Sequence, residues 1–478
     1  MEEITVLQMN DSHAYLESHY EYFWKNGKQK YRKVGGYGRI ASYFDEVKNQ
    51  NPGSVLILDN GDTIHGTYPV VKSEGEKMIP MLNEMDFDAW TAHWDFAYGP
   101  EKLKRIAERL NYPLLAINCY SEETDELVFD PYRIVNKNGI EIGLIGIANT
   151  IVDETMPEYF SDGIYLTLGD EELPGYIDEL KEKDVDLIVV LAHLGYPQEV
   201  KLAREIDGID VLISGHTHNR LYEPVEVNDT LIIQSGCHGS FIGRLDLKLE
   251  DDSIVGYDHE LKEISSSITP DEDVQKIIED ILEPHEEMLE EKIGETKIGL
   301  ARDKVMETTM DNLLLKALIE TSEAEMAFSN GWRYGAPIPP GAITMRDIWD
   351  IIPTNPPVSV CKITGQELWD MMEENLENTF ATDPYDQAGG YVKRCYGINV
   401  YFKIENSKGL RIQEFFVGDK RLDKDETYKA SFVTTQGVPA KYGTDRKDLK
   451  IDAVTALKDY IQEQSPVEPE IEGTVVPV

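Results

Sequence analysis

Short apolar segments alternate with helical segments through the first half of the chain. Six segments, at 4–11, 54–62, 113–119, 141–150, 186–195 and 210–218, run apolar and then reach Asp, Asn, His or Gly. Between them, residues 35–49 and 99–111 have the spacing of amphipathic helices. Buried strands whose ends open into polar loops are typical of α/β domains. We therefore expect an α/β fold whose chemistry lies at the strand ends.

The segment at 269–295 has a different pattern, because its charged residues would lie on almost every face of a helix. Thr269 precedes Pro270 and a group of acidic residues, which is typical of a helix start. A helix that is polar on every face suits a connection between domains. We expect domains at 1–265 and 293–478 joined by a connector helix at 266–292. In the second domain, helices are predicted in 306–325 and 364–378, with strands near 396–404 and 410–418.

Composition adds a strongly negative charge to this picture. The chain has 46 Lys and Arg against 89 Asp and Glu, a formal net charge of −43. Such a field repels nucleic acid and anionic membranes, so we expect no nucleic acid and no membrane partner. Adaptation for solubility or high salt explains the charge, and an acidic wall that gathers divalent metals is the alternative. The four cysteines lie far apart without a C-x-x-C pair, which disfavours a zinc knot or a disulfide framework.

The N-terminus begins "MEEITVLQMND", with neither the basic region nor the apolar core of a signal peptide. No window has 18 uninterrupted apolar residues, so no transmembrane helix is expected. From this sequence we predict a cytoplasmic protein, or a periplasmic or extracellular one if a signal peptide was removed.

Carboxylate and imidazole side chains recur at the predicted strand ends. They are Asp11, His13, Asp62, His93, His193, His216 and His218. In an extended segment, side chains two residues apart point the same way, so His216 and His218 are expected to converge on one point. A single histidine at a strand end is usually a hydrogen-bonded loop residue. The whole set is instead typical of metal-ion hydrolases.

The mixture of imidazole and carboxylate suits manganese, zinc or iron better than calcium or magnesium. Asp62 could bridge two ions, and such a pair activates water and holds both the attacking and the leaving oxygen of an in-line displacement. These residues therefore predict hydrolysis of an ester of a tetrahedral anion.

The ordered stretches "NDSH", "GDTIHGT", "AHWDFAYG", "LAHLG" and "GHTH", followed by "NGWRYGAPIPPGAIT" and "ITGQEL", resemble the 5′-nucleotidase family. The resemblance covers nearly the whole chain. It implies a four-layer α/β/β/α metallophosphoesterase sandwich followed by a second α/β substrate-binding domain. It also implies two divalent metal ions, manganese or zinc, and a small anionic substrate such as a nucleotide or another phosphate ester.

The resemblance also implies roles for the strand-end residues. The first ion would be held by Asp11, His13, Asp62 and His218, and the second by Asp62, His193 and His216. His93 would be the catalytic residue that steadies the phosphoryl group. Nucleoside 5′-monophosphates would then be hydrolysed by in-line attack of a metal-bound hydroxide.

The third motif departs from the family pattern. The family normally has Asn-His-Glu there, with the Asn as a metal ligand, whereas this chain has Ala92, His93, Trp94 and Asp95. Water, Asn118 or Asn149 could take the missing place, or the second ion is held more weakly. The stretch "HWDFAYG" resembles the SoxB branch, thiosulfohydrolases that release sulfate from a cysteine-bound sulfane on a carrier protein.

In the second domain, Arg333 resembles the family arginine that meets the anionic end of the substrate. Tyr391 in "AGGYVKR" resembles one of two aromatic residues that hold the base. The second is matched only loosely, near Tyr442. Both substrate-binding assignments compete with simpler ones, a surface ion pair for Arg333 and a core aromatic for Tyr391.

Other features have structural explanations. We expect His65 to be a loop residue near Asp62, Cys237 to be a small buried residue, and His238 to lie in a loop near the metals. Residues 19–34, rich in aromatic and basic side chains, are interpreted as an inserted loop beside the active site. Three functions stay open: a nucleotidase, a SoxB-like thiosulfohydrolase, and a family member that binds nucleotide or metal without turnover.

Overall fold

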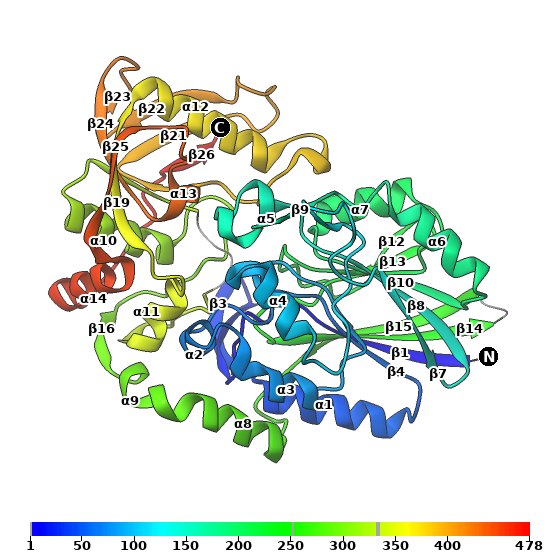
Figure 1. Ribbon diagram of the computed structural model, residues 1–478. Coiled ribbons are helices and arrows are strands. Elements are labelled where there is room, and N and C mark those ends of the chain that lie inside the picture. The colour runs from blue at the N-terminus through cyan, green and yellow to red at the C-terminus, as the bar shows by residue number, and fades with distance from the viewer. Residues whose placement is uncertain (1, 251–252, 331–334) are drawn as a thin grey trace. The chain divides into compact units, whose positions relative to one another are not determined.

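The computed structural model describes residues 2–250, 253–330 and 335–478. The chain forms two compact units (Figure 1): residues 1–23 with 32–284, and residues 24–31 with 285–478. The division at Pro284 falls inside the segment that we expected to connect the domains.

Two β-sheets form the centre of the first unit. The first has the order β15-β14-β1-β4-β5. Its strands are β1 (Glu2–Met9), β4 (Val55–Asp59), β5 (Ala89–Trp90), β14 (Phe241–Glu250) and β15 (Ser253–Glu263). The strands β1, β4 and β5 are parallel, so their carboxyl ends meet at one edge of the sheet.

The second sheet has the order β12-β13-β11-β10-β8-β7. Its strands are β7 (Tyr132–Lys137), β8 (Ile140–Ile147), β10 (Leu187–Ala192), β11 (Val211–Ser214), β12 (Val225–Val227) and β13 (Thr230–Ile233). The central strands β8, β10, β11 and β13 are parallel. As expected of parallel strands covered on both faces, β10 is buried along its whole length.

Alternation along β10 shows how the layers pack. Val189 and Leu191 lie in the core shared with the first sheet. Ile188 and Val190 lie in a second core, formed with helices α6 (Leu173–Glu182) and α7 (Tyr196–Glu205). On the first sheet, α1 (Tyr37–Gln50) contacts β4 and also α8 (Glu272–Leu282). The predicted four-layer α/β/β/α sandwich is thereby confirmed (Figure 1).

Shorter elements complete the first unit. The helices are α2 (Tyr68–Lys72), α3 (Ile79–Glu84), α4 (Pro100–Ala107) and α5 (Ile151–Glu154), and β6 (Cys119–Ser121) pairs with β9 (Ile164–Leu166). The apolar segment at 113–118 is not a strand, contrary to the sequence pattern. It makes only isolated bridges, from Leu114 to Trp90 and from Leu115 to Asp130.

Residues 19–34, which we expected to form an inserted loop beside the active site, form a β-hairpin. Strand β2 (His19–Lys25) pairs with β3 (Lys28–Val34) through a turn at Asn26 and Gly27. Both turn residues have positive φ, 54° and 71°. Such a two-residue turn matches the right-handed twist of paired strands, which explains why Asn-Gly stands between them.

The predicted connector is not polar on every face. Helix α8 begins after Asp271, whose carboxylate accepts a hydrogen bond from Val274 N at 2.9 Å. It buries Val274, Ile278 and Ile281, because apolar residues recur every three to four positions between the acidic ones. The helix therefore packs into the first unit, against α1 and α3. A short helix, α9 (Glu286–Leu289), follows it.

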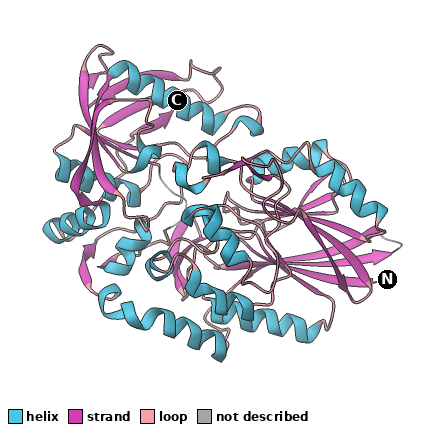
Figure 2. Cartoon of the chain, viewed as in Figure 1, coloured by secondary structure: helices cyan, strands magenta, loops and turns pink. Residues whose placement is uncertain are grey.

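The second unit has its own sheets and core (Figure 2). A five-stranded sheet has the order β20-β17-β24-β19-β25, with strands Arg394–Tyr396, Met326–Ser329, Thr427–Phe432, Pro357–Thr364 and Thr444–Asp452. A four-stranded sheet has the order β23-β22-β21-β26, with strands Lys420–Arg421, Ile412–Val417, Ile398–Phe402 and Val475–Pro477. Strand β16 (Lys292–Thr296) pairs with β18 (Gly341–Thr344).

The helices of this unit are α10 (Thr309–Ser322), α11 (Met345–Ile351), α12 (Gly365–Phe380), α13 (Thr434–Gly437) and α14 (Ala453–Gln464). Helix α12 begins at Thr364, which forms a reciprocal capping box with Glu367. Its buried face joins both larger sheets in one core. Among the described residues, no helix is long and apolar enough to cross a membrane.

Candidate metal centre

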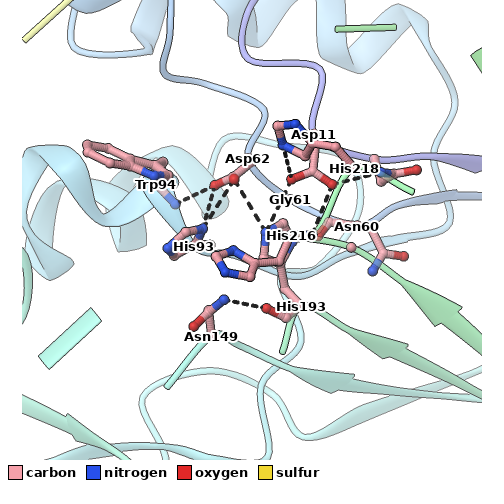
Figure 3. Close-up of polar contacts among 12 residues, drawn as sticks. Asp11, Asn60, Gly61, Asp62, His93, Trp94, Asn149, His193, His216 and His218 are labelled. Atoms are coloured by element: carbon pink, nitrogen blue, oxygen red, sulfur yellow. Dashed lines mark hydrogen bonds and ion pairs between the residues drawn. The ribbon is translucent and has the colours of Figure 1, made fainter. Parts of the chain in front are cut away.

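The strand-end residues gather at the carboxyl ends of both sheets of the first unit. Asp11 and His13 follow β1, Asp62 follows β4, and His93 follows β5 in the first sheet. His193 follows β10, while His216 and His218 follow β11 in the second. Figure 3 shows the two aspartates, Asp11 and Asp62, surrounded by the histidines. The convergence follows from parallel strands, which deliver their ends to the same edge.

Two groups of potential metal ligands share one carboxylate. Within each group, the donor atoms lie within 4.8 Å of one another. The first group is Asp11, His13, Asp62 and His218, and the second is Asp62, His93, His193 and His216. The structure therefore brings together both predicted ligand sets. It also places His93 in the second group, although the resemblance gave it a role on the phosphoryl group.

The distances within the groups suit ligands of common ions. His218 Nε2 lies 3.1 Å from Asp11 Oδ1, and His13 Nε2 lies 3.6 Å from Asp62 Oδ2. In the second group, His193 Nε2 lies 3.4 Å from Asp62 Oδ2, and it also lies 3.5 Å from Asp11 Oδ1 of the first group. Atoms bound to one ion at about 2 Å lie roughly 3 to 4 Å apart.

Buried polar atoms without hydrogen-bond partners also point to a cation. Asp11 Oδ1 and His193 Nε2 are both buried and lack a hydrogen-bond partner. Buried polar groups are normally hydrogen-bonded, because an unpaired group costs about 1 to 3 kcal/mol. An ion in the first group would satisfy Asp11 Oδ1 and an ion in the second would satisfy His193 Nε2, so the residues fit divalent metals.

Backbone groups hold His193 in the form that a metal ligand requires. Its Nδ1 lies 2.5 Å from the carbonyl oxygen of Asn60. Because a carbonyl only accepts, Nδ1 carries a proton, so Nε2 is the nitrogen that would bind a metal once it loses its own proton. The Asn60 side chain donates to the carbonyls of Ala192 and Ile213, at the ends of β10 and β11. Asn60 thus ties the first sheet to the two strands that carry the histidines.

The charges of the centre favour a bound cation. Burial raises the pKa of Asp62, but the neighbouring His93 and His193 outweigh it and hold this pKa well below its usual value. Burial lowers the pKa of His13 to about 3, so this imidazole stays neutral. Burial also disfavours a charged His193, yet the charges of Asp62 and Asp11 raise its pKa to about 10. The two carboxylates therefore stabilise positive charge at this point.

Five of the candidate ligands have left-handed backbone conformations. The φ angles are 49° for Asp11, 46° for His13, 56° for Asp62, 67° for His216 and 57° for His218. Strand β11 ends at Ser214, so the extended geometry that we assumed for the two histidines does not apply. Instead of meeting at one point, His216 and His218 enter different groups. Such conformations cluster at functional sites.

Two family models match most of the chain. Residues 4–220 match the calcineurin-like phosphoesterase, and residues 292–436 match the 5′-nucleotidase C-terminal domain. The chain belongs to the 5′-nucleotidase family of metallophosphoesterases. Members of this family are hydrolases that bind divalent metals, so the clusters described above coincide with the family's chemistry.

Relatives and solved structures agree with this assignment. A 5′-nucleotidase of Vibrio parahaemolyticus is 26% identical over 97% of this chain and 90% of its own. A Bos taurus 5′-nucleotidase is 24% identical over 99% and 90%, respectively. Among solved structures, the Thermus thermophilus sulfate thiohydrolase SoxB with glycerol has a TM-score of 0.91 at 23% identity, covering 99% of this chain and 96% of its own. A 5′-nucleotidase precursor, also of Thermus thermophilus, has a TM-score of 0.87 at 23% identity, covering 100% and 99%. These structures share the fold.

The third motif of this metallophosphoesterase supports the loop of Asp62 through an acidic residue that the sequence analysis assigned no role. Asp95 Oδ1 accepts hydrogen bonds from the backbone N–H groups of Thr63 and Ile64, both at 2.9 Å. Its Oδ2 accepts from Asp62 N at 2.9 Å and from His93 N at 3.2 Å. One buried carboxylate thus fixes the backbone that presents the shared ligand. The signal available in the sequence was an acid two residues after a strand-end histidine.

Neither asparagine considered as a replacement for the family ligand has an uncommitted amide. Asn118 donates to the carbonyls of Ala148 and Thr167, and its oxygen accepts from Ala148 N. Asn149 donates to the His193 carbonyl at 2.5 Å and accepts from Ile151 N. Both side chains hold backbone loops in place. In the described residues, His93 is the side chain of the third motif that lies within the second ligand group.

The predicted substrate-binding residues belong to the second unit. Arg333 lies outside the described residues. Tyr391 is partly exposed, its carbonyl accepts a hydrogen bond from Thr379, and its ring centroid lies 5.9 Å from the Arg394 guanidinium carbon. In the first unit, His65 is buried and stacks on Trp94 at 5.0 Å between ring centroids.

Proposed function

We propose that this protein hydrolyses phosphate monoesters, with nucleoside 5′-monophosphates as substrates and two manganese or zinc ions as cofactors. The observation that carries the proposal is the pair of ligand groups sharing Asp62. Similarity to proteins named 5′-nucleotidase over 97% of the chain supports the choice of substrate.

Two divalent ions in these groups would lower the pKa of water and stabilise charge on a transferring phosphoryl group. The protein's own residues prepare the site for this chemistry. Asp62 lies between the groups, and Asp95 and Asn60 hold the backbone and the imidazole on either side. Burial of both carboxylates excludes water that would screen their charge.

His93 is suited to act on the substrate. Its Nδ1 lies 3.0 Å from Asp62 Oδ1, which orients the ring. Its Nε2 is buried and has no hydrogen-bond partner in the described structure. A proton on Nε2 would donate to a phosphoryl oxygen and stabilise the charge that develops there. In the second unit, we assign Arg333 to the anionic end of the substrate and Tyr391 to the base.

Product release from a mixed panel at fixed Mn²⁺ tests this proposal. The panel contains nucleoside 5′-monophosphates, cyclic nucleotides, sugar phosphates and a cysteine S-thiosulfonate. We expect the wild type to release phosphate from the 5′-monophosphates. Asp62→Asn should lower the rate of release by about a hundredfold or more, because the shared ligand loses its charge. Asp86→Asn, at a side chain that is 73% exposed, is the control and should keep full activity.

One result would contradict nucleotidase activity, and another would contradict any catalytic activity. Sulfate release from the thiosulfonate with no phosphate from any ester would support the SoxB-like activity instead. That candidate is favoured by the stretch "HWDFAYG", which resembles the SoxB branch and in which Trp94 donates its backbone N–H to Asp62 Oδ1 at 2.6 Å. Equal rates for the wild type and His93→Ala, both at background, would leave a binding protein without catalysis.

A further inference from the structure

A third group of metal-binding side chains lies beside the first ligand group. His19 and Glu21 stand two residues apart on β2, so they face the same side of the strand. His238 lies in the loop between β13 and β14. The donor atoms of the three residues lie within 4.8 Å of one another. The His238 ring centroid is 6.0 Å from that of His13 and 6.1 Å from that of His218.

Glu21 and His238 are buried and His19 is half-buried, and the three side chains lie close together, but their hydrogen bonds are poorly matched. Glu21 is 2% exposed and His238 is 3% exposed. His238 Nδ1 lies 3.8 Å from Glu21 Oε2, which is too long for a hydrogen bond, and it contacts the weakly hydrogen-bonding Cys237 Sγ at 3.5 Å. His238 Nε2 is buried without a hydrogen-bond partner. The spacing is instead that of two ligands of one ion, which lie about 3 to 4 Å apart.

While Ser240 donates its proton to Glu21, a neutral His19 cannot satisfy both of its own contacts. Its Nδ1 lies 3.3 Å from the Glu17 carbonyl, which only accepts. Its Nε2 lies 3.0 Å from Ser240 Oγ, whose single proton is donated to Glu21 Oε2 at 3.2 Å. A neutral imidazole has one proton for these two acceptors. With the proton on Nδ1, Nε2 has a free lone pair, and it contacts the same Ser240 hydroxyl that lies 3.2 Å from Glu21 Oε2.

Glu21 is oriented so that one oxygen faces this point. Arg220 approaches the other oxygen, Oε1, with its guanidinium nitrogen at 3.0 Å. The guanidinium carbon also lies 4.8 Å from the ring centroid of Phe241, which fixes its position. The carboxylate therefore offers Oε2 as a single ligand atom, supported from behind by an arginine.

We propose that His19, Glu21 and His238 bind a third divalent transition-metal ion, such as Zn²⁺, beside the first ligand group. Two imidazoles and one carboxylate are a common donor set for zinc and iron, and they leave positions open for water or an anion. The ion would accept the lone pair of His19 Nε2 and fill the gap between His238 Nδ1 and Glu21 Oε2. This site does not depend on the substrate proposed above.

Its affinity should be lower than that of the first group. The third group contains one carboxylate, and Arg220 already balances its charge. The first group contains two carboxylates, Asp11 and Asp62. Because attraction between a cation and its ligands grows with their net negative charge, a chelator should remove the third ion before the ion of the first group.

Zinc stoichiometry tests the proposal. The full chain is stripped with a chelator, reloaded with excess Zn²⁺, passed through a desalting column, and analysed for zinc per chain by mass spectrometry. We expect three ions in the wild type and two in His19→Ala. Ser240→Ala removes the competing hydroxyl and His259→Ala removes a histidine outside all three groups, so both should keep three.

The alternative is a plain hydrogen-bond network with a protonated His19. That network would be weakened by Ser240→Ala and would bind no ion, so equal zinc content in the wild type and His19→Ala would overturn the proposal. Zinc held loosely by acidic surface residues would be the same in all four proteins. If His19→Ala fails to fold, anomalous scattering from wild-type crystals with zinc decides. A peak among His19, Glu21 and His238 supports the site, and no peak there refutes it.

Discussion

Asp95 shows how a single residue supports the metal centre without touching a metal. Four backbone N–H groups, from Asp62, Thr63, Ile64 and His93, donate to its two oxygens. Burial raises its pKa, as does the nearby charge of Asp62, and the backbone donors oppose this shift. The carboxylate therefore connects the shared ligand to the third motif.

We expect Asp95→Asn to weaken metal binding by about 10- to 100-fold, the usual cost of losing a group that orients a ligand. The amide has one accepting oxygen in place of two, so at least one buried N–H loses its partner. Calorimetric titration of the metal-free protein with Mn²⁺ measures the effect. Asp86→Asn is again the control, and wild-type affinity in Asp95→Asn would contradict this role.

The candidate ligands could be predicted from the sequence because histidines and aspartates stand directly after apolar strands. Their division between two groups could not be predicted from strand geometry. It depends on left-handed φ angles at residues such as His216 and His218, and a pattern of side-chain types does not encode them. The roles of these residues stay predictions until metal binding is measured.

Among the secondary-structure elements, the spacing of apolar residues along the chain identified the central strands and the main helices. Strands β8, β10 and β11 are continuous apolar runs, and both of their faces are covered. The pattern was misleading at residues 113–118, where an apolar segment is buried without a regular ladder. It was also misleading at α8, because many acidic residues concealed a buried face.

In the second unit, Asp311 joins three elements through buried charges. It stands in the first turn of α10 and accepts from Arg302 Nε at 2.8 Å. Its other oxygen lies 3.0 Å from Arg394 Nε, on β20. Burial raises the pKa of Asp311, but the two arginines outweigh it and leave this pKa below 3.8.

Asp311→Asn should destabilise the protein by about 3 to 5 kcal/mol, because it leaves two buried guanidinium groups without a counter-charge. A carboxylate whose pKa is lower in the folded than in the unfolded protein stabilises the fold at pH values above its unfolded pKa. This stabilisation is lost as the pH falls through its folded pKa. The difference in melting temperature between the wild type and the variant should therefore be largest above pH 3.8 and should shrink as the pH falls below that value. Scanning calorimetry at several pH values measures it.

An exposed ion pair provides the matched control. Asp445 pairs with Lys362 at 2.8 Å, and its side chain is 67% exposed. Asp445→Asn should change stability by less than about 1 kcal/mol, as solvent screens such pairs. If Asp311→Asn and Asp445→Asn had the same melting temperature, burial would not explain how Asp311 stabilises the protein.

At the scale of the whole molecule, the ordered motifs predicted both the family and its two-part architecture, because they span nearly the full length of the chain. The net charge of −43 led us to expect no nucleic-acid or membrane partner, but it did not indicate a substrate. Nothing in composition distinguishes a phosphate ester from a thiosulfonate, since both are small anions that the same arginine and metal chemistry would bind.

Anomalous X-ray scattering from crystals grown with Mn²⁺ tests whether two metal ions share Asp62. We predict one peak among Asp11, His13 and His218 and another near His193 and His216, both within coordination distance of Asp62. A single peak, or two peaks of which only one contacts Asp62, would contradict the account.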